Sequence, residues 1–137
     1  MDLPKNERTF NFEGTGDATQ APYEGEFTVL CVPDMRARRA IEVEKSRLSA
    51  DIANPTDNLA GLSIILANLR VRILSGPRWW EESLGGFQIM DENILVMLYD
   101  KVLEQEDLWR ASLRTKAKPK KDEEEDGLGE AQEESKK

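Results

Sequence analysis

Few side chains in this sequence could carry out chemistry. The 137 residues contain no histidine, which removes the commonest general base near neutral pH and the commonest metal ligand. A single cysteine, Cys31, excludes an internal disulfide and a thiolate cluster for zinc. Catalysis would therefore rest on carboxylates, Lys or Tyr alone. We expect a protein that is not an enzyme and that needs no cofactor or metal.

The strongest candidate for a binding function is the tandem Trp79-Trp80, which follows the Gly76-Pro77 break. Adjacent positions on a regular element point in different directions, so a single core does not readily enclose both rings. Two interpretations stay open. Either one ring fills the core while the other covers its rim, or the pair is an aromatic hot spot, where each ring contributes about 2 kcal/mol or more when sealed from water.

A second apolar edge follows near the end of the last predicted helix. Trp109 and Leu113 are four residues apart and share a helical face, with Leu108 beside them. That face either completes the core or projects toward a partner. Together with Trp79 and Trp80, these three residues are the candidate partner-binding residues.

Three smaller features have structural interpretations. Asp91 and Glu92 could join another carboxylate around a metal, but their position favours the cap of a helix. Gly85-Gly86 fits a turn and lacks the spacing and the Lys-Ser/Thr pair of a phosphate-binding loop. Cys31 continues the apolar alternation of Phe27 and Val29, which predicts a buried, inert thiol and agrees with a reducing compartment.

Periodicity predicts the elements that must position these residues. Residues 9–12 and 24–32 read as two antiparallel strands, joined by a long, turn-rich connection over 14–22. Because an isolated strand pair is marginal in water, the ribbon must lie on the helices or on a partner's sheet. Its free edges invite pairing between copies, so a homo-oligomer is expected to be possible.

Three main helices are predicted after the ribbon. The first covers 35–50 and has a narrow apolar face; its exposed basic side is either simply solvated or contacts an acidic partner or the protein's own tail. The second is the central apolar helix, which ends at Ser75 before Gly76-Pro77 and places Arg70 and Arg72 in its final turns. The third starts at Asp91 and continues less regularly beyond Gln105.

These elements predict a mainly α protein with a small N-terminal β ribbon, an α+β fold, in three parts. Residues 1–22 form an arm with the first short strand and loop, residues 23–115 a helical domain with a β segment, and residues 116–137 a disordered charged tail. In the tail Leu128 is the only large apolar residue, so we expect disorder.

The net charge of −8 disfavours binding to nucleic acid. No leader opens the chain and no apolar run approaches the roughly 18 residues that span a bilayer, which predicts no membrane association and a cytoplasmic protein.

The layout of residues 24–115 resembles the small tail assembly chaperones of long-tailed bacteriophages. The resemblance lies in the succession of EGEFTVLCVPD, the charged helix RARRAIEVEKSRL, the apolar helix LAGLSIILANLRVRI, the turn GPRWWEESLGG and the final helix DENILVMLYDKVLEQEDLWR. It implies a mostly helical protein in the cytoplasm of the bacterial host that coats the tape-measure protein while tail-tube subunits polymerise around it. The alternative is a virion structural protein, such as a head–tail adaptor or a tail or capsid accessory component.

Overall fold

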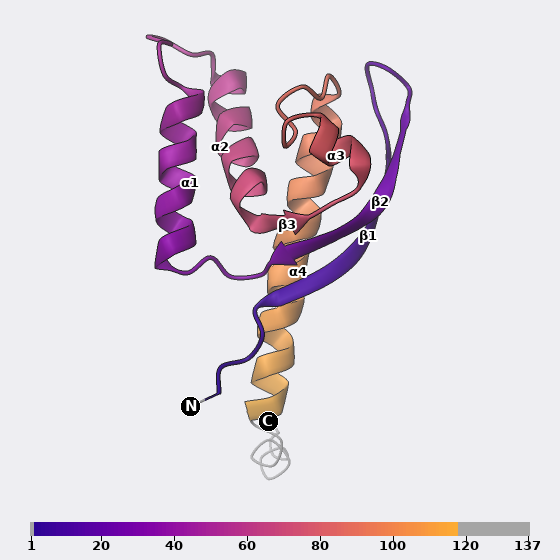
Figure 1. The fold of residues 1–137 in the computed structure, drawn as a ribbon, viewed down its shortest axis with the longest axis vertical. Helices are drawn as coiled ribbons and strands as arrows, with labels where there is room; N and C mark the ends of the chain where they lie inside the picture. The colour runs from indigo at the N-terminus through magenta and orange to yellow at the C-terminus, as the bar shows by residue number, and fades with distance from the viewer. Residues whose placement is uncertain (1, 118–137) are drawn as a thin grey trace, which may run out of the picture. The chain divides into compact units, whose positions relative to one another are not determined.

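The structure is a computed structural model that describes residues 2–117. Within these residues, three strands and four helices form an α+β fold, which confirms the predicted class with its N-terminal ribbon and three long helices (Figure 1). Their order is β1 (Glu7–Thr15), β2 (Pro22–Leu30), α1 (Met35–Leu48), α2 (Asp57–Arg72), β3 (Ile73–Ser75), α3 (Arg78–Glu82) and α4 (Glu92–Ala117). Most of the predicted tail, residues 118–137, lies outside the described residues, and Lys116 and Ala117 belong to α4.

The chain divides into two compact units, the first ending at Glu106 and the second beginning at Asp107. The first unit contains the sheet, α1 to α3 and residues 92–106 of α4. The described part of the second unit is the remainder of α4, residues 107–117. The predicted arm, residues 1–22, supplies β1 to the sheet of the first unit.

The strands pair antiparallel in the order β1-β2-β3. β1 and β2 pair along their whole length, from Glu7 opposite Leu30 to Thr15 opposite Pro22. The connection is therefore only residues 16–21, shorter than the predicted 14–22, because Gly14 and Thr15 still take part in the ladder. β3 was not predicted. Residues 73–75 continue the helical spacing of α2 in sequence, but pairing of Ile73 and Ser75 with β2 draws this segment into the sheet.

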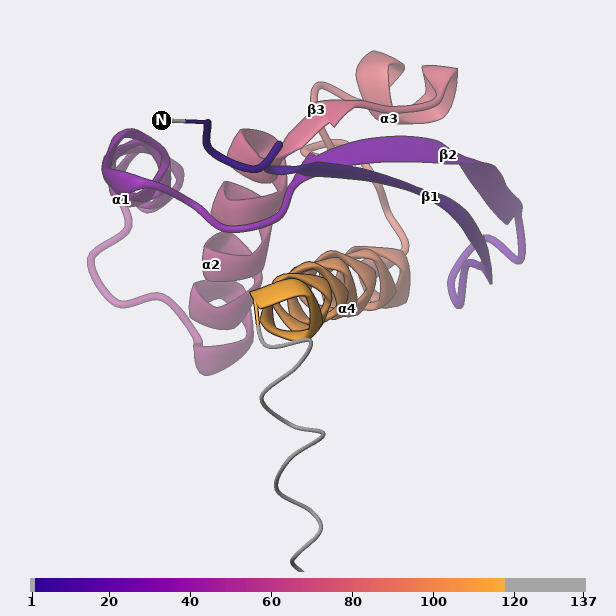
Figure 2. The same cartoon turned by 90° about the horizontal axis from the view of Figure 1, so that it is seen from below.

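One face of the ribbon is buried against α2 and residues 92–106 of α4 (Figure 2). Phe12, Phe27 and Val29 of the ribbon are at most 1% exposed. They join a single cluster with Leu66 and Leu69 of α2 and with Ile94, Leu95, Leu98 and Val102 of α4. α1 lies beside α2 (Figure 1) and buries only Ala37 and Ile41, in agreement with its predicted narrow apolar face.

Asp91 fastens the loop between β1 and β2 to the start of α4. Its Oδ1 accepts hydrogen bonds from the backbone N–H groups of Ala18 (2.7 Å) and Thr19 (2.8 Å), and its Oδ2 accepts from the hydroxyls of Thr19 and Tyr23 (both 2.7 Å). Gly16 lies so close that a Cβ there would be 2.2 Å from Asp91 Cγ. The predicted capping role of this side chain is therefore wrong, because the carboxylate bonds a loop about 70 residues away in sequence.

These hydrogen bonds favour the ionised carboxylate. The Thr19 and Tyr23 hydroxyls lower the pKa of Asp91 from 3.8 to about 2. The same contact raises the pKa of Tyr23, because the phenol donates its proton to an anion. Asp91 is thus a charged, fully hydrogen-bonded group in a site where its side chain is 1% exposed.

Arg72 ties the end of β2 to α4. Sequence analysis placed it on the final turn of a helix as a cation favoured by the helix dipole, but the structure buries it, with 3% exposed. Its Nε donates to the carbonyl of Leu30 (3.3 Å), and its Nη2 donates to the carbonyl of Cys31 and pairs with Glu106 (2.9 Å). The thiol of Cys31 is buried as predicted, and burial raises its pKa.

We expect Asp91 to make stability depend on pH in the acid range. The folded-state pKa lies below that of the unfolded chain, so the contribution is present above about pH 4 and is lost as the pH falls through about 2. Urea unfolding at a series of pH values should show Asp91→Asn to be less stable than the natural protein at pH 7, with the difference shrinking toward pH 2. Asp100→Asn, at an exposed carboxylate of α4, should keep the natural profile. A constant difference between Asp91→Asn and the natural protein would contradict this account.

We expect Arg72→Ala to lower the free energy of unfolding by about 3 kcal/mol, because it removes the buried guanidinium that pairs with Glu106 and donates to two carbonyls at the end of β2. Arg78→Ala is the matched control. It removes a surface pair with Glu82 whose side chains are 88% and 63% exposed, and it should change stability by less than about 0.5 kcal/mol. Chemical denaturation of both variants measures the two effects, and equal losses would refute the anchoring role of Arg72.

Candidate functional site

Trp80 is a core residue. It lies in the short helix α3, is 5% exposed and meets Phe27 edge-on, with ring centroids 6.2 Å apart. A Cβ on Gly86 would lie 2.6 Å from the Trp80 ring, so the chain passes directly over the indole. In this conformation the ring offers no surface to a partner.

Trp79 covers the rim of the same core. Its half-buried ring packs edge-on against Tyr23 (4.9 Å between centroids) and Phe27 (5.6 Å). Its Nε1 donates to the carbonyl of Glu24 at 2.9 Å. Within residues 2–117, β3 pairs with β2 only at Thr28 and Val29 and no other strand pairs on that side, so Trp79 protects an earlier, unpaired part of this edge of β2. The geometry agrees with the packing interpretation of the tandem, and a partner contact by the exposed part of Trp79 stays a prediction.

The other predicted partner-binding residues lie in the second compact unit. Leu108 is 44% exposed, and Trp109 and Leu113 are half-buried on the same part of α4. The predicted site is therefore divided between the two units.

A different surface of the first unit gathers exposed apolar side chains. We call it the apolar groove. It consists of two adjoining hollows, with volumes of about 340 and 220 Å³, that share Leu48 and Phe87. Its apolar lining comes from α1, α2, the segment 83–91 and α4, namely Leu48, Leu59, Leu62, Leu66, Leu84, Phe87, Ile89, Met90 and Leu95.

Four of these side chains are far more exposed than a folded core requires. Leu59, Leu84, Phe87 and Met90 are 40%, 56%, 58% and 72% exposed. Single exposed apolar residues are normal, but a contiguous group around a hollow marks an interaction site. The groove therefore replaces the Trp pair as the candidate functional site.

The turn after α3 creates one wall of the groove. Leu84, Gly85 and Gly86 have φ values of 60°, 63° and 89°, so three successive residues adopt the left-handed conformation. Gly86 must be glycine, because Trp80 and Leu66 leave no space for a Cβ. Leu84, unlike glycine, has a side chain that disfavours this backbone conformation, and the left-handed conformation costs a leucine about 1–2 kcal/mol relative to the right-handed one. An unfavourable backbone that leaves a leucine in solvent is typical of a residue kept for binding.

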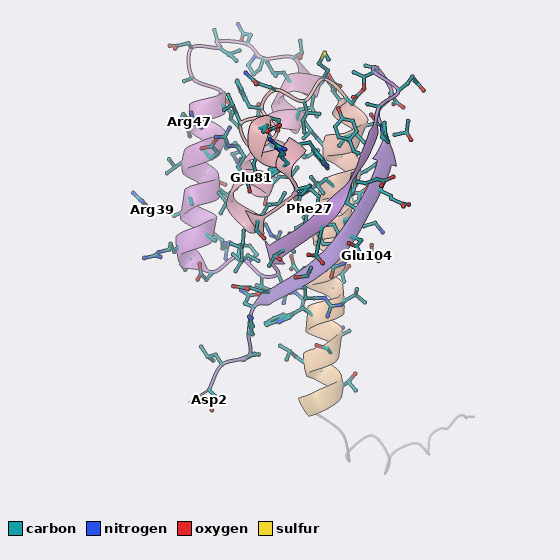
Figure 3. The ribbon with its side chains drawn as sticks, turned by 45° about the vertical axis from the view of Figure 1, so that its right-hand side comes forward. Asp2, Phe27, Arg39, Arg47, Glu81 and Glu104 are labelled. Carbon is teal, nitrogen blue, oxygen red and sulfur yellow. The ribbon has the colours of Figure 1, made fainter. Side chains whose placement is uncertain are left out.

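Charged side chains mark the two ends of the groove. At one end Glu44 pairs with both Arg47 (2.6 Å) and Arg70 (3.0 Å), and the two arginines line the larger hollow. At the other end Glu92 lines the smaller hollow and accepts a long hydrogen bond of 3.4 Å from Asn58. Figure 3 shows Arg39, by contrast, projecting from α1 away from the ribbon that carries Phe27.

The groove is suited to apolar side chains of another protein. Of its hollows, the larger, about 340 Å³, is at the lower limit of the roughly 300–1,000 Å³ of pockets that enclose drug-sized ligands, and the smaller, about 220 Å³, is below it. Within the described residues, no three acidic or thiol side chains gather closely enough to hold a metal ion. None of the helices within residues 2–117 is both long enough and apolar enough to cross a bilayer.

Sequence reasoning missed the groove because its walls come from four segments. The available signal was Phe87 and Met90, two large apolar residues in a short connection next to Gly85-Gly86, where polar residues are the norm. Comparison of the chain with protein-family profiles, curated proteins and solved structures finds no match. The groove must therefore be interpreted from its own geometry.

We expect the two tryptophans to respond differently to substitution. Trp80→Ala should lower the free energy of unfolding by about 3–5 kcal/mol, because it empties a packed core position. Trp79→Phe keeps an aromatic ring against Tyr23 and Phe27 and loses the hydrogen bond to Glu24, a cost of about 1 kcal/mol. Denaturant unfolding measures both, and a Trp80→Ala variant as stable as Trp79→Phe would contradict the packing described.

Proposed function

We propose that the protein is a tail assembly chaperone of a long-tailed bacteriophage. In this proposal it acts in the cytoplasm of the bacterial host, where it shields an apolar stripe of the tape-measure protein and yields it to tail-tube subunits as they polymerise. The observation that carries the proposal is the apolar groove with its four exposed apolar side chains. Further support comes from the order of the strands, charged helix, apolar helix and final helix, which is the layout in which the sequence resembles that family.

The groove has the form that receives an amphipathic helix. Such a helix presents apolar side chains at positions i, i+3, i+4 and i+7 along one face, and neighbouring anchors of that kind could enter the two hollows. A tape-measure protein is a long, largely helical rod, so it would offer this stripe repeatedly. Each copy of the chaperone would then cover a short part of the rod.

The expected affinity of one groove is low, which suits a temporary cover. Two large apolar side chains moved out of water contribute about 1.5–3 kcal/mol each. A dissociation constant of 1 μM needs about 8 kcal/mol, and association itself has a substantial entropic cost. A single groove therefore holds a client helix weakly, and many copies along one rod would be needed. Growing tube subunits could displace each copy in turn.

A virion structural protein is the second candidate, and the free edge of β1 favours it. β1 is a nine-residue edge strand that pairs only with β2 among the described residues. Such an edge can add a strand from a neighbouring subunit in an assembly. Mass spectrometry of purified phage particles distinguishes the two functions: a structural component is present in fixed copy number, whereas an assembly chaperone is absent.

We expect Leu84→Glu combined with Phe87→Glu to abolish co-purification with the co-expressed tape-measure protein, because two charges would enter the apolar groove. The matched control is Met35→Glu combined with Val43→Glu, which alters two apolar residues of α1 that are 75% and 54% exposed and do not line the groove. Both variants should unfold at the temperature of the natural protein. Undiminished capture by the groove variant would overturn the proposed use of this surface.

A further inference from the structure

We infer that the groove selects an amphipathic helix that carries a carboxylate beside its apolar stripe, and that it binds this helix in one direction, with the carboxylate at Arg47 and Arg70. This inference rests on the proposed function, because it assigns the occupant of the same groove. It adds the charge of the partner and its orientation, which apolar contacts alone leave open.

The arginine end of the groove carries excess positive charge. Glu44 is the acidic partner that the structure gives Arg47 and Arg70 within residues 2–117. One carboxylate between two guanidinium groups leaves a net charge of +1. The contacts use Nε and Nη2 of Arg47 and Nε of Arg70, so other N–H groups of both guanidiniums are available to a second carboxylate.

The two arginines differ in exposure in a way that suits recognition. The Arg70 side chain is 27% exposed and lies under the turn, where a Cβ on Gly85 would be 3.6 Å from its Cγ and Nε. The Arg47 side chain is 60% exposed at the mouth of the larger hollow. Arg70 thus provides a fixed positive charge, and Arg47 can reach toward an occupant while Glu44 links the two.

The opposite end of the groove rejects a carboxylate. Exposed Glu92 lines the smaller hollow together with Leu59 and Met90. A helix carries partial negative charge at its C-terminus and partial positive charge at its N-terminus. Both the side-chain charge and the helix dipole therefore favour the same direction, with the N-terminal end of the client at Glu92 and its acidic C-terminal end at the arginines.

Fluorescence anisotropy with synthetic helical peptides tests the inference. Three labelled peptides of about 18 residues, or five helical turns, share one leucine stripe. The first has a Glu beside the stripe near the C-terminus, the second has Gln at that position, and the third has the Glu near the N-terminus. The natural protein should bind the first peptide about fivefold more tightly than the second and third, the effect of one partly exposed ion pair.

Two variants identify the groups responsible. Arg47→Gln keeps the Arg70–Glu44 pair and should remove most of the fivefold preference. Arg78→Gln, at an exposed arginine of α3 outside the groove, should keep the preference. Phe87→Glu should abolish binding of all three peptides, which shows that they occupy the groove.

Several results would overturn the inference. These are equal affinity of the natural protein for the three peptides, a preference that survives Arg47→Gln, binding that survives Phe87→Glu, or no binding at all. A dimer of the natural protein that Phe87→Glu dissociates would also overturn it, because a second copy would then occupy the groove. Failure to capture the tape-measure protein while the peptide preference holds would instead reject the proposed function and keep the inference.

Discussion

The burial of one face of the β ribbon is the constraint on which the rest of the first unit depends. An isolated pair of strands is only marginally stable in water, so other elements must cover Phe12, Phe27 and Val29. α2 and α4 provide that cover, because their buried apolar side chains join those of the ribbon in one cluster. Polar anchors then hold the ribbon in place, with Asp91 at its loop, Arg72 at its other end and Trp79 along its open edge.

This arrangement explains why a groove remains on the opposite side of α2. The ribbon covers one side of the helical layer, and α1 covers the other side with buried Ala37 and Ile41 and half-buried Leu48, which are too small a surface to seal it. The segment 83–91 passes over the remaining gap through a left-handed turn and leaves Leu84, Phe87 and Met90 in solvent. A more extensive apolar contact from α1 would have covered this surface, and polar residues in the segment 83–91 would have made it less apolar.

The charges around the groove give it a direction. Glu44, Arg47 and Arg70 form a bridged trio at one end, and Glu92 stands at the other. Partly exposed ion pairs contribute little to stability, so the trio contributes more to specificity than to folding. In the proposed function, weak apolar contacts would hold a helical client and allow its release, and the arginines at one end of the groove would orient it.

The sequence alone determined the α+β class, the three long helices and their approximate limits, because hydrophobic periodicity and helix-breaking residues act locally. It also limited the chemistry, since a chain without histidine and with a single cysteine cannot form a histidine-based triad or an internal disulfide. Only the tertiary structure decided the roles of Asp91 and Arg72, whose partners lie far away along the chain, and the extended state of residues 73–75, which depends on pairing with β2. It likewise decided that Trp80 is buried while Phe87 is exposed. Burial depends on which segments pack together in space, and the local sequence around an apolar residue does not indicate this.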